Sequence, residues 1–133
     1  EWVRYEYNPE PQTSAIDWEL AGWTPPDTMD YVANFVIDSS WYWSWYTPEG
    51  DWIGTVSTVN TSGLPDAVNN TVKRDFPGYT IKSVNKEFDK KRTAYEIKLD
   101  KVADNMKALI SEDGALLKKK GKEDGQKIKQ KNY

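Results

Sequence analysis

The sequence predicts an α+β fold: an antiparallel sheet of about eight strands from two related units, with one helix at about residues 65–75 packed on one face. Two observations lead to this prediction. Short segments that alternate apolar and polar residues recur along most of the chain, separated by Pro, Gly and Asn. One segment in the second half instead has apolar residues at helical spacing. The length of 133 residues suits a single domain.

Residues 1–63 are predicted to form strands only. β-branched and aromatic residues dominate each segment, as is typical of strands. Pro9 and Pro11 end the first strand, and the Pro and Gly within residues 47–51 indicate a hairpin loop. The expected strands are residues 1–7, 15–23, 30–38, 41–46 and 52–59.

One amphipathic helix is expected near the middle of the chain. Pro65 lies where a first helical turn accepts proline, and Pro77 stops the run. Between them, apolar residues follow at every fourth position, namely Val68, Val72 and Phe76. This spacing predicts a helix at about residues 65–75.

The remaining segments are expected to be strands. In residues 79–88 the apolar positions change parity between Ile81 and Val84, which predicts a bulge or a bend. Residues 93–101 alternate regularly and should turn Glu96, Lys98 and Asp100 outward. The last predicted strands are residues 105–111 and 115–119, joined by an Asp-Gly turn.

We expect one domain, residues 1–120, followed by a flexible basic tail, residues 121–133. The tail is rich in lysine and has one aliphatic residue, Ile128. It could steer an anionic partner or a membrane surface at low salt, or it could be a solvated chain end.

The two halves of the chain align with each other at an offset of 64 residues. This offset places Gly50 on Gly114 and Trp45 on Leu109, so that two hairpins with an acidic-Gly turn recur in register. We therefore interpret residues 1–59 as a first unit without a helix, and residues 64–120 as a second unit. A duplication explains the match economically, although two meanders of similar length could also align in this way by chance.

Residues 64–120 resemble a known family. The resemblance lies in Leu64-Pro65, the helix, residues 75–79, the strand at 95–99 and residues 112–117, in that order and spacing. Together they resemble the PepSY-like family of β-lactamase-inhibitor-like proteins, typical of periplasmic or secreted proteins of Bacteroidetes. Residues 1–63 match the family only through the shifted alignment, because they lack its Leu-Pro helix.

The resemblance implies export and a helix packed on an antiparallel sheet. It carries over no catalytic residues. Relatives of the broader fold include inhibitors that bind enzymes with an open sheet face and modules that restrain peptidases, so the resemblance favours a periplasmic or secreted binding module.

The composition argues against an enzyme. The chain has no His and no Cys, which removes the commonest general base, the thiolate nucleophile and most zinc ligands. The remaining carboxylate pairs, Asp17 with Glu19 and Glu49 with Asp51, are expected to be surface groups. Glu49 and Asp51 flank Gly50 and could bind a calcium ion weakly, but their loop lacks the oxygen ligands of a strong site. We expect no catalytic residues, no metal and no cofactor.

Charges and aromatic residues divide unequally between the halves. Residues 1–63 hold one basic residue against ten acids and 13 of the 18 aromatic residues, whereas residues 64–133 hold 17 basic residues against 11 acids. Nucleic-acid binding is not expected, because it needs aromatic and basic side chains together. Membrane association is expected only through an N-terminal anchor removed from the chain.

The tryptophans Trp41, Trp43 and Trp45 are the candidate binding residues, together with Trp18. In the shifted alignment the intervening residues have the more apolar parity, which would leave the tryptophans on the open sheet face. An exposed aromatic row suits a protein partner or a sugar ring. The alternative is that the row is itself the core, replacing the missing helix.

The sequence therefore favours a non-catalytic module that binds a protein through an aromatic-rich open sheet face. A carbohydrate or small-ligand binding module that uses the tryptophans is the alternative, and a peptidase-restraining module of the PepSY type is a further one.

Overall fold

The structure is a computed structural model, and it describes residues 2–4, 16–24 and 29–121. Two α-helices and one short 3-10 helix occur there, at α2 (Trp18–Ala21), α3 (Asp66–Asp75) and η1 (Thr61–Gly63). The strands are β1 (Trp2–Arg4), β2 (Tyr31–Ile37), β3 (Ser40–Tyr46), β4 (Trp52–Val59), β5 (Thr80–Phe88), β6 (Thr93–Lys101), β7 (Asp104–Ser111) and β8 (Leu116–Gly121).

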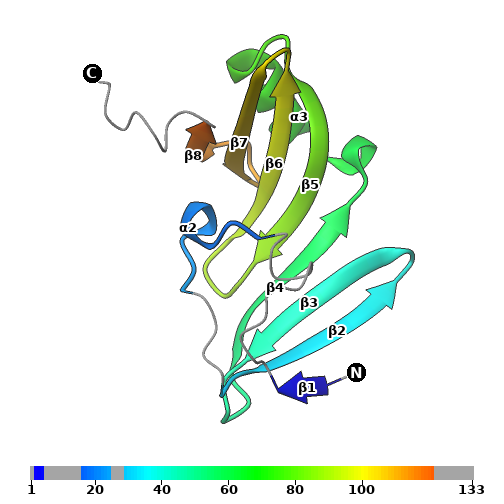
Figure 1. The fold of residues 1–133 in the computed structure, drawn as a ribbon, viewed down its shortest axis with the longest axis vertical. Helices are drawn as coiled ribbons and strands as arrows, with labels where there is room; N and C mark the ends of the chain where they lie inside the picture. The colour runs from blue at the N-terminus through cyan, green and yellow to red at the C-terminus, as the bar shows by residue number, and fades with distance from the viewer. Residues whose placement is uncertain (1, 5–15, 25–28, 122–133) are drawn as a thin grey trace.

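The strands β1 to β8 lie in chain order in one antiparallel sheet. Figure 1 shows the sheet twisting so strongly that the β2–β3 hairpin points well away from the direction of β5 to β7. The α+β class and the antiparallel sheet with a helix on one face are as the sequence predicts. In the part of the chain described, no helix is long and apolar enough to cross a membrane.

The predicted helix is confirmed as α3. Pro65 precedes its first residue, and the Phe76 amide donates the closing hydrogen bond to the Val72 carbonyl. Its apolar stripe packs on β5, β6 and β7, and the core that results is mostly aliphatic. The buried residues of this core are Leu64, Val68, Val72, Phe76, Val84, Tyr95, Ile97, Leu99, Ala108 and Ile110.

The strand predicted at residues 15–23 is wrong, because the structure has the single turn of α2 there. The Asp17 side chain accepts a hydrogen bond from the Leu20 amide at 3.0 Å, and Gly22 ends the turn with φ of 75°. An N-cap Asp and a left-handed Gly at this spacing are helix signals, and here they outweigh the strand-like composition. The first half of the chain thus carries a short helix, contrary to the expectation of none.

The predicted irregularity in residues 79–88 is confirmed as a β-bulge. The pairing of β5 with β6 shifts between Ile81 and Ser83, and Lys82 is the extra residue. Glu96 departs from its predicted outward position, since it is 2% exposed and lies beneath the segment that carries α2. Of the predicted tail, Gly121 ends β8, and residues 122–133 lie outside the described part, as do residues 5–7 of the first predicted strand.

The hairpins β3–β4 and β7–β8 share several details at the 64-residue offset. Gly50 and Gly114 both adopt left-handed backbone, with φ of 94° and 96°. Each Gly amide donates to a carbonyl three residues earlier at 2.9 Å, namely Thr47 and Ser111. The strand register shifts after Trp45 in one hairpin and after Leu109 in the other.

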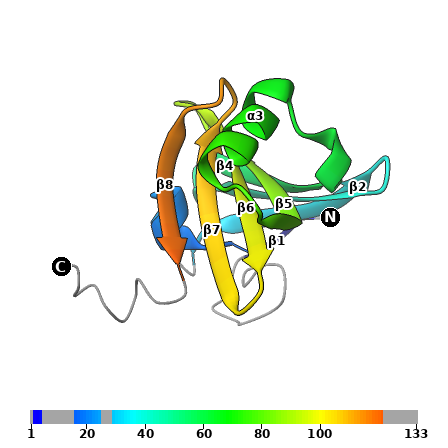
Figure 2. The ribbon, with the colours of Figure 1, turned by 90° about the horizontal axis from the view of Figure 1, so that it is seen from above.

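The molecule has its main cores on opposite faces of the one sheet. Core residues under α3 occupy one face, and Ile16, Trp43, Trp45 and Val56 form a second core on the other. A small cluster of Leu20, Ala94 and Leu109 joins α2 to the C-terminal strands on that second face. Figure 2 shows α3 lying to one side of the sheet. We call the opposite face, which residues 16–24 cross, the α2 face.

Candidate binding face

The predicted site residues Trp41, Trp43 and Trp45 all point to the α2 face. Their orientation follows from the pairing of β3 with β4, in which Trp43 lies opposite Val56, a residue of the second core. Side chains two apart on a strand share a face. The three tryptophans therefore share the face opposite the one that α3 covers.

The burial of the three tryptophans differs sharply along β3. Trp45 is 1% exposed, Trp43 is 8% exposed and Trp41 is 50% exposed. Ile16 and Trp18 cover the buried end of the row, with the Trp18 ring edge-on to Trp45 at 5.3 Å between centroids. Trp43 and Trp45 are therefore core residues, and Trp41 alone of the row offers a large exposed ring.

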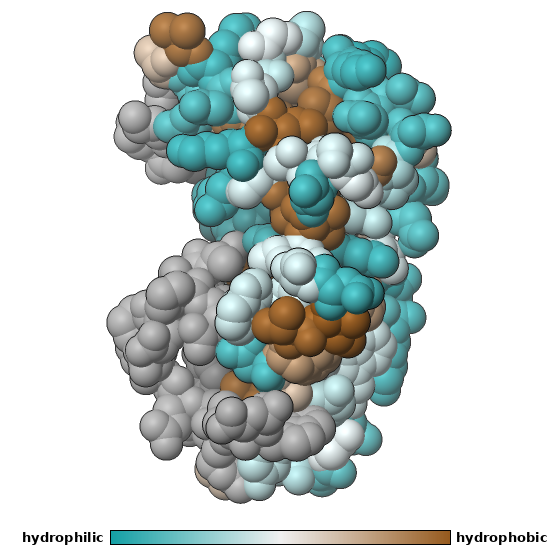
Figure 3. All heavy atoms as spheres, turned by 90° about the vertical axis from the view of Figure 1, so that its right-hand side faces the viewer, coloured by the Kyte–Doolittle hydropathy of each residue, from teal (hydrophilic) through white to brown (hydrophobic). Residues whose placement is uncertain are grey.

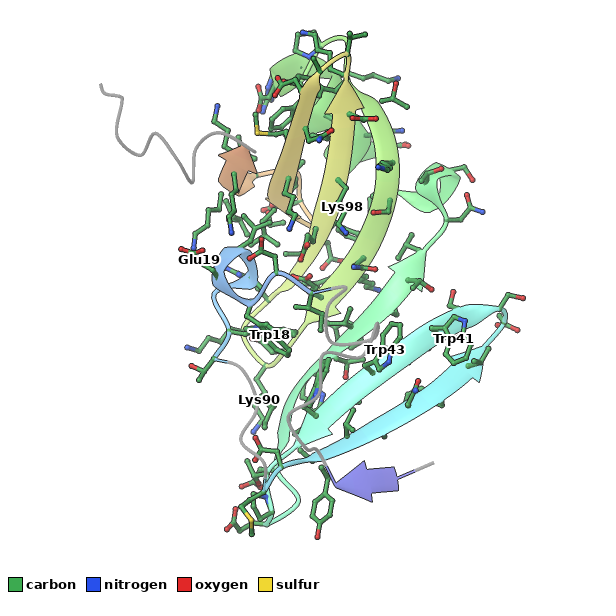
Figure 4. All side chains as sticks on the ribbon, viewed as in Figure 1. Trp18, Glu19, Trp41, Trp43, Lys90 and Lys98 are labelled. Atoms are coloured by element: carbon green, nitrogen blue, oxygen red, sulfur yellow. The ribbon has the colours of Figure 1, made fainter. Side chains whose placement is uncertain are left out.

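Trp41 belongs to an apolar site at the tip of the β2–β3 hairpin. Val36 lies opposite it in the register and is also 50% exposed. The Trp41 ring stacks on Trp43 at 6.4 Å between centroids with 19° between planes, and its backbone amide donates to Thr58 Oγ1 at 3.0 Å. Figure 4 shows Trp41 nearer the turn than Trp43, and Figure 3 shows apolar surface on the side toward which the hairpin points. We call Val36 and Trp41 the hairpin site.

A second feature of the α2 face is a cavity of about 480 Å³ beside the buried end of the row. Three indole rings contribute to its wall, from Trp18, Trp23 and Trp45. Its polar lining comes from Thr24, Asp30, Asp89 and Lys91. We call this the tryptophan cavity. Its volume and mixed lining are those of small-molecule sites.

Trp23 was not among the sequence-predicted site residues, yet it organises this cavity. Its indole Nε1 donates to Asp89 Oδ2 at 2.9 Å, and its ring lies 3.0 Å from the position that a Cβ on Gly54 would occupy. Burial acts to raise the pKa of Asp89, but hydrogen bonds from the Lys91 and Arg92 amides and from Trp23 outweigh it and lower the pKa. The signal in the sequence was the glycine at position 54. That this glycine faces Trp23 becomes visible only in the tertiary fold.

Residues 17–19 are held to the C-terminal strands by lysines. Asp17 Oδ2 accepts from Lys107 at 3.0 Å and from Lys120 at 3.1 Å, and Glu19 Oε1 lies 3.2 Å from the Lys120 Nζ. Burial acts to raise the pKa of Asp17, but the Leu20 amide and the two lysines lower it to about 2. Asp17 is therefore ionised at neutral pH and fastens the α2 segment across the sheet.

Two buried carboxyl groups lie beneath this segment, on β5 and β6. Glu87 is 3% exposed and Glu96 is 2% exposed, and Glu96 Oε1 accepts from the Asp17 amide at 3.3 Å. Burial, followed by the neighbouring Glu96 carboxyl, raises the pKa of Glu87 far above its usual range. Within the described residues, no group donates a hydrogen bond to either carboxyl oxygen of Glu87. A protonated Glu87 could itself donate to the Glu96 carboxylate. Both carboxyl groups are thus buried side by side on β5 and β6, and the raised pKa belongs to Glu87.

The carboxylate pairs that the sequence left for acid-base chemistry are not brought into a site. Asp17 and Glu19 bind lysines, and Glu49 and Asp51 lie in the exposed β3–β4 turn. In the described ranges no three acidic residues come close enough together to hold a metal ion.

Comparison with known proteins places the fold. No family model matches the sequence, and neither does any curated protein. A BLIP-like protein from Bacteroides fragilis has the same fold, with 21% identity and a TM-score of 0.62 over 70% of this chain and 68% of its own. A DUF2874 family protein from Bacteroides ovatus gives 23% identity and a TM-score of 0.64 over 77% of each chain.

A candidate periplasmic protein from Bacteroides eggerthii is similar to the same degree, at 22% identity and a TM-score of 0.63 over 72% of this chain and 73% of its own. The chain shares the fold of these proteins. At such identities the likeness concerns the fold alone, and none of the three is described as a PepSY protein.

Proposed function

We propose that the protein is a non-catalytic binding module, periplasmic or secreted, that binds a protein partner through the hairpin site of the α2 face. The observation that carries the proposal is the pair of Val36 and Trp41, each half exposed and adjacent across two strands. Adjacent exposed apolar side chains are a common feature of protein interaction sites.

Trp41 has the properties of an interface anchor. Its ring rests on the buried Trp43, so little side-chain freedom remains to be lost on binding. Large rings held in this way dominate the binding free energy of many protein interfaces. The partner would gain apolar contact here without any rearrangement of the sheet.

Two further observations support the proposal. The carboxyl groups of Glu87 and Glu96 are 3% and 2% exposed beneath the segment that carries α2, which is typical of structural rather than acid-base groups. Among the proteins that share the fold, one is described as BLIP-like and another as periplasmic, which supports a binding role and export as a proposal by analogy of fold.

The test is capture of a partner by immobilised wild-type protein from a periplasmic extract, repeated with Trp41→Ala and with Ile37→Ala. Ile37 is the matched control because it is 51% exposed on the same hairpin but points to the other face. We expect Trp41→Ala to lose the captured protein and Ile37→Ala to retain it, and the purified partner to bind the two variants with the same difference in Kd. Equal capture by both variants, or no capture by the wild type, contradicts the proposal.

A second candidate function rests on the tryptophan cavity, which could bind a carbohydrate or another small ligand. Trp18 and Trp23 are partly exposed there, at 6.3 Å between ring centroids, with Asp30 and Asp89 close by as polar partners for hydroxyl groups. A glycan array probed with wild type and with Trp18→Ala tests it. Binding that is lost with Trp18→Ala but kept with Trp41→Ala would assign the function to this cavity.

We also propose that the two halves of the chain are related units, 1–59 and 64–120. The shared turn geometry at Gly50 and Gly114, with its matching hydrogen bonds, supports a common origin. Membership of the PepSY-like family, and a peptidase as the bound partner, remain part of the proposed function. Closer relatives should align their own halves at the same offset, and halves that drift apart in such sequences would argue for chance similarity.

A further inference from the structure

A lysine-lined cavity of about 390 Å³ lies on the α2 face, on strands β5 to β8. Four lysines line it, Lys82, Lys98, Lys107 and Lys120, and its remaining lining comes from Leu99, Asn105, Met106 and Gly121. Neither the hairpin site nor the tryptophan cavity includes any of these residues. We call it the lysine cavity.

Local structure brings the four side chains together. Lys98 and Lys107 are direct cross-strand partners, and Lys107 pairs in turn with Lys120, so three lysines lie side by side across β6, β7 and β8. Like charges directly opposite one another destabilise a sheet. Lys82 joins them from β5 because the bulge makes it the extra residue beside Lys98.

One side of the cluster already binds a carboxylate. Lys107 and Lys120 both donate to Asp17 Oδ2, at 3.0 Å and 3.1 Å. Within residues 16–24 and 29–121, no carboxylate forms an ion pair with Lys82 or Lys98. The cavity thus holds four positive charges. Asp17, together with Glu19 at 3.2 Å from the Lys120 Nζ, compensates those of Lys107 and Lys120 only.

The size of the cavity indicates the kind of ligand. A concave space of this volume is typical of small-molecule sites, whereas protein interfaces are flatter. Lysine ammonium groups act as point charges without the planar fork of arginine, so they accept carboxylate and phosphate oxygens alike.

Four lysines line this concave space of about 390 Å³, and two of them, Lys82 and Lys98, have no carboxylate partner among the described residues. From these observations we infer that the lysine cavity binds a small polyanion carrying two or more carboxylate or phosphate groups. Lys82 and Lys98 bind one anionic group. Lys107 and Lys120 share the second with Asp17 or exchange Asp17 for it. The site is independent of the proposed protein partner.

Titration calorimetry with citrate and, separately, with pyrophosphate tests the inference, at constant ionic strength set with sodium chloride. We expect saturable binding of at least one of them, and its identity tells whether carboxylates or phosphates are preferred. Lys98→Gln should weaken that binding about tenfold, the typical effect of losing one hydrogen bond to a charged group. Lys90→Gln is the matched control, since it removes an exposed charge from the β5–β6 turn, away from the cavity (Figure 4).

Asp17→Asn gives a second, opposite test. Asn can still cap α2, but it no longer competes as an anion for Lys107 and Lys120. We expect this variant to bind the anion several-fold more tightly than the wild type.

The inference is overturned if neither anion binds saturably, or if Lys98→Gln and Lys90→Gln bind equally well. It is also overturned if Asp17→Asn binds more weakly than the wild type while its circular dichroism and thermal unfolding show that it is folded.

Discussion

The strands β2 to β4 and the strands β5 to β8 belong to one sheet but bury opposite faces. The C-terminal strands pack aliphatic side chains under the ten-residue α3, and the N-terminal strands pack tryptophans under the segment that carries α2. A long amphipathic helix brings a broad apolar stripe of its own, whereas a short segment brings few side chains. Bulky rings on the sheet therefore supply the buried area where the covering segment is small.

The largest expected effect comes from removing the ring at the centre of the N-terminal core. Trp45→Ala should lower the free energy of unfolding by about 3 to 5 kcal/mol, because the ring is fully buried and leaves a cavity. Denaturant unfolding of the variant measures this. If the free energy of unfolding fell by less than about 1 kcal/mol, Trp45 would not be a core residue. The contrast between a tryptophan core in one half and an aliphatic core in the other would then be wrong.

The next effect concerns the carboxyl pair, which lies where the two regions meet. The raised pKa means that folded Glu87 keeps its proton while the unfolded chain releases it, so the stabilisation present at acid pH declines as the pH rises above about 4.5 toward the folded value. Glu87→Gln removes this dependence and should stabilise the protein by on the order of 1 to 3 kcal/mol at pH 7.

Unfolding measured from pH 5 to pH 9 gives the slope for the wild type, for Glu87→Gln and for the exposed control Glu112→Gln. We expect Glu87→Gln alone to flatten the slope. Parallel curves for all three proteins would mean that Glu87 is ionised in the folded state.

A smaller effect is expected at the attachment of α2. Asp17→Ala removes the helix cap and both lysine contacts, and should cost about 1 to 2 kcal/mol at pH 7. The lowered pKa gives the sign: the contribution is present above the unfolded value near 3.8 and is lost as the pH falls through about 2.

Thermal unfolding at pH 7 and at pH 2 should therefore separate Asp17→Ala from the wild type mainly at pH 7. Glu19→Gln is the control, because the Glu19 side chain is 80% exposed and its ion pair contributes little. A change in Glu19→Gln as large as that in Asp17→Ala would contradict this account of the attachment.

The smallest effect on stability is expected at the hairpin site. Trp41→Ala should change the free energy of unfolding by less than about 1 kcal/mol, since half of the side chain is already in water. We expect the free energy of unfolding of Trp41→Ala to be close to that of the wild type, while that of Trp45→Ala is much lower. This result would establish that one strand carries both a core tryptophan and a surface tryptophan. A loss for Trp41→Ala as large as that for Trp45→Ala would place Trp41 in the core.

Much of the fold follows from local patterns. The helix α3 is delimited by Pro65 and Pro77 and patterned by residues four apart, so neighbouring residues alone predict it. The bulge in β5 shows in the change of parity between Ile81 and Val84 for the same reason. The strand predicted at residues 15–23 was wrong because the helix there is a single turn between its caps, Asp17 and Gly22. One turn is too short for a helical period to appear in the sequence.

The candidate site was predicted in part. The alternating tryptophans and their common face follow from the period of two in a strand. Their division into buried Trp43 and Trp45 and exposed Trp41 did not follow, because it depends on where residues 16–24 lie, some 20 residues earlier in the chain. The lysine cavity and the carboxyl pair were missed for the same reason, since their members come from different strands.

Local sequence therefore determines which segments form strands and helices here and which residues share a face, because these depend on spacing along the chain. Which face is buried, and where, is decided only when distant segments pack. Trp45 is buried because Ile16 and Trp18 cover it, whereas Trp41, four residues earlier on the same strand, is half exposed. Burial is a property of the assembled layers, and no single strand contains the information about what will cover it.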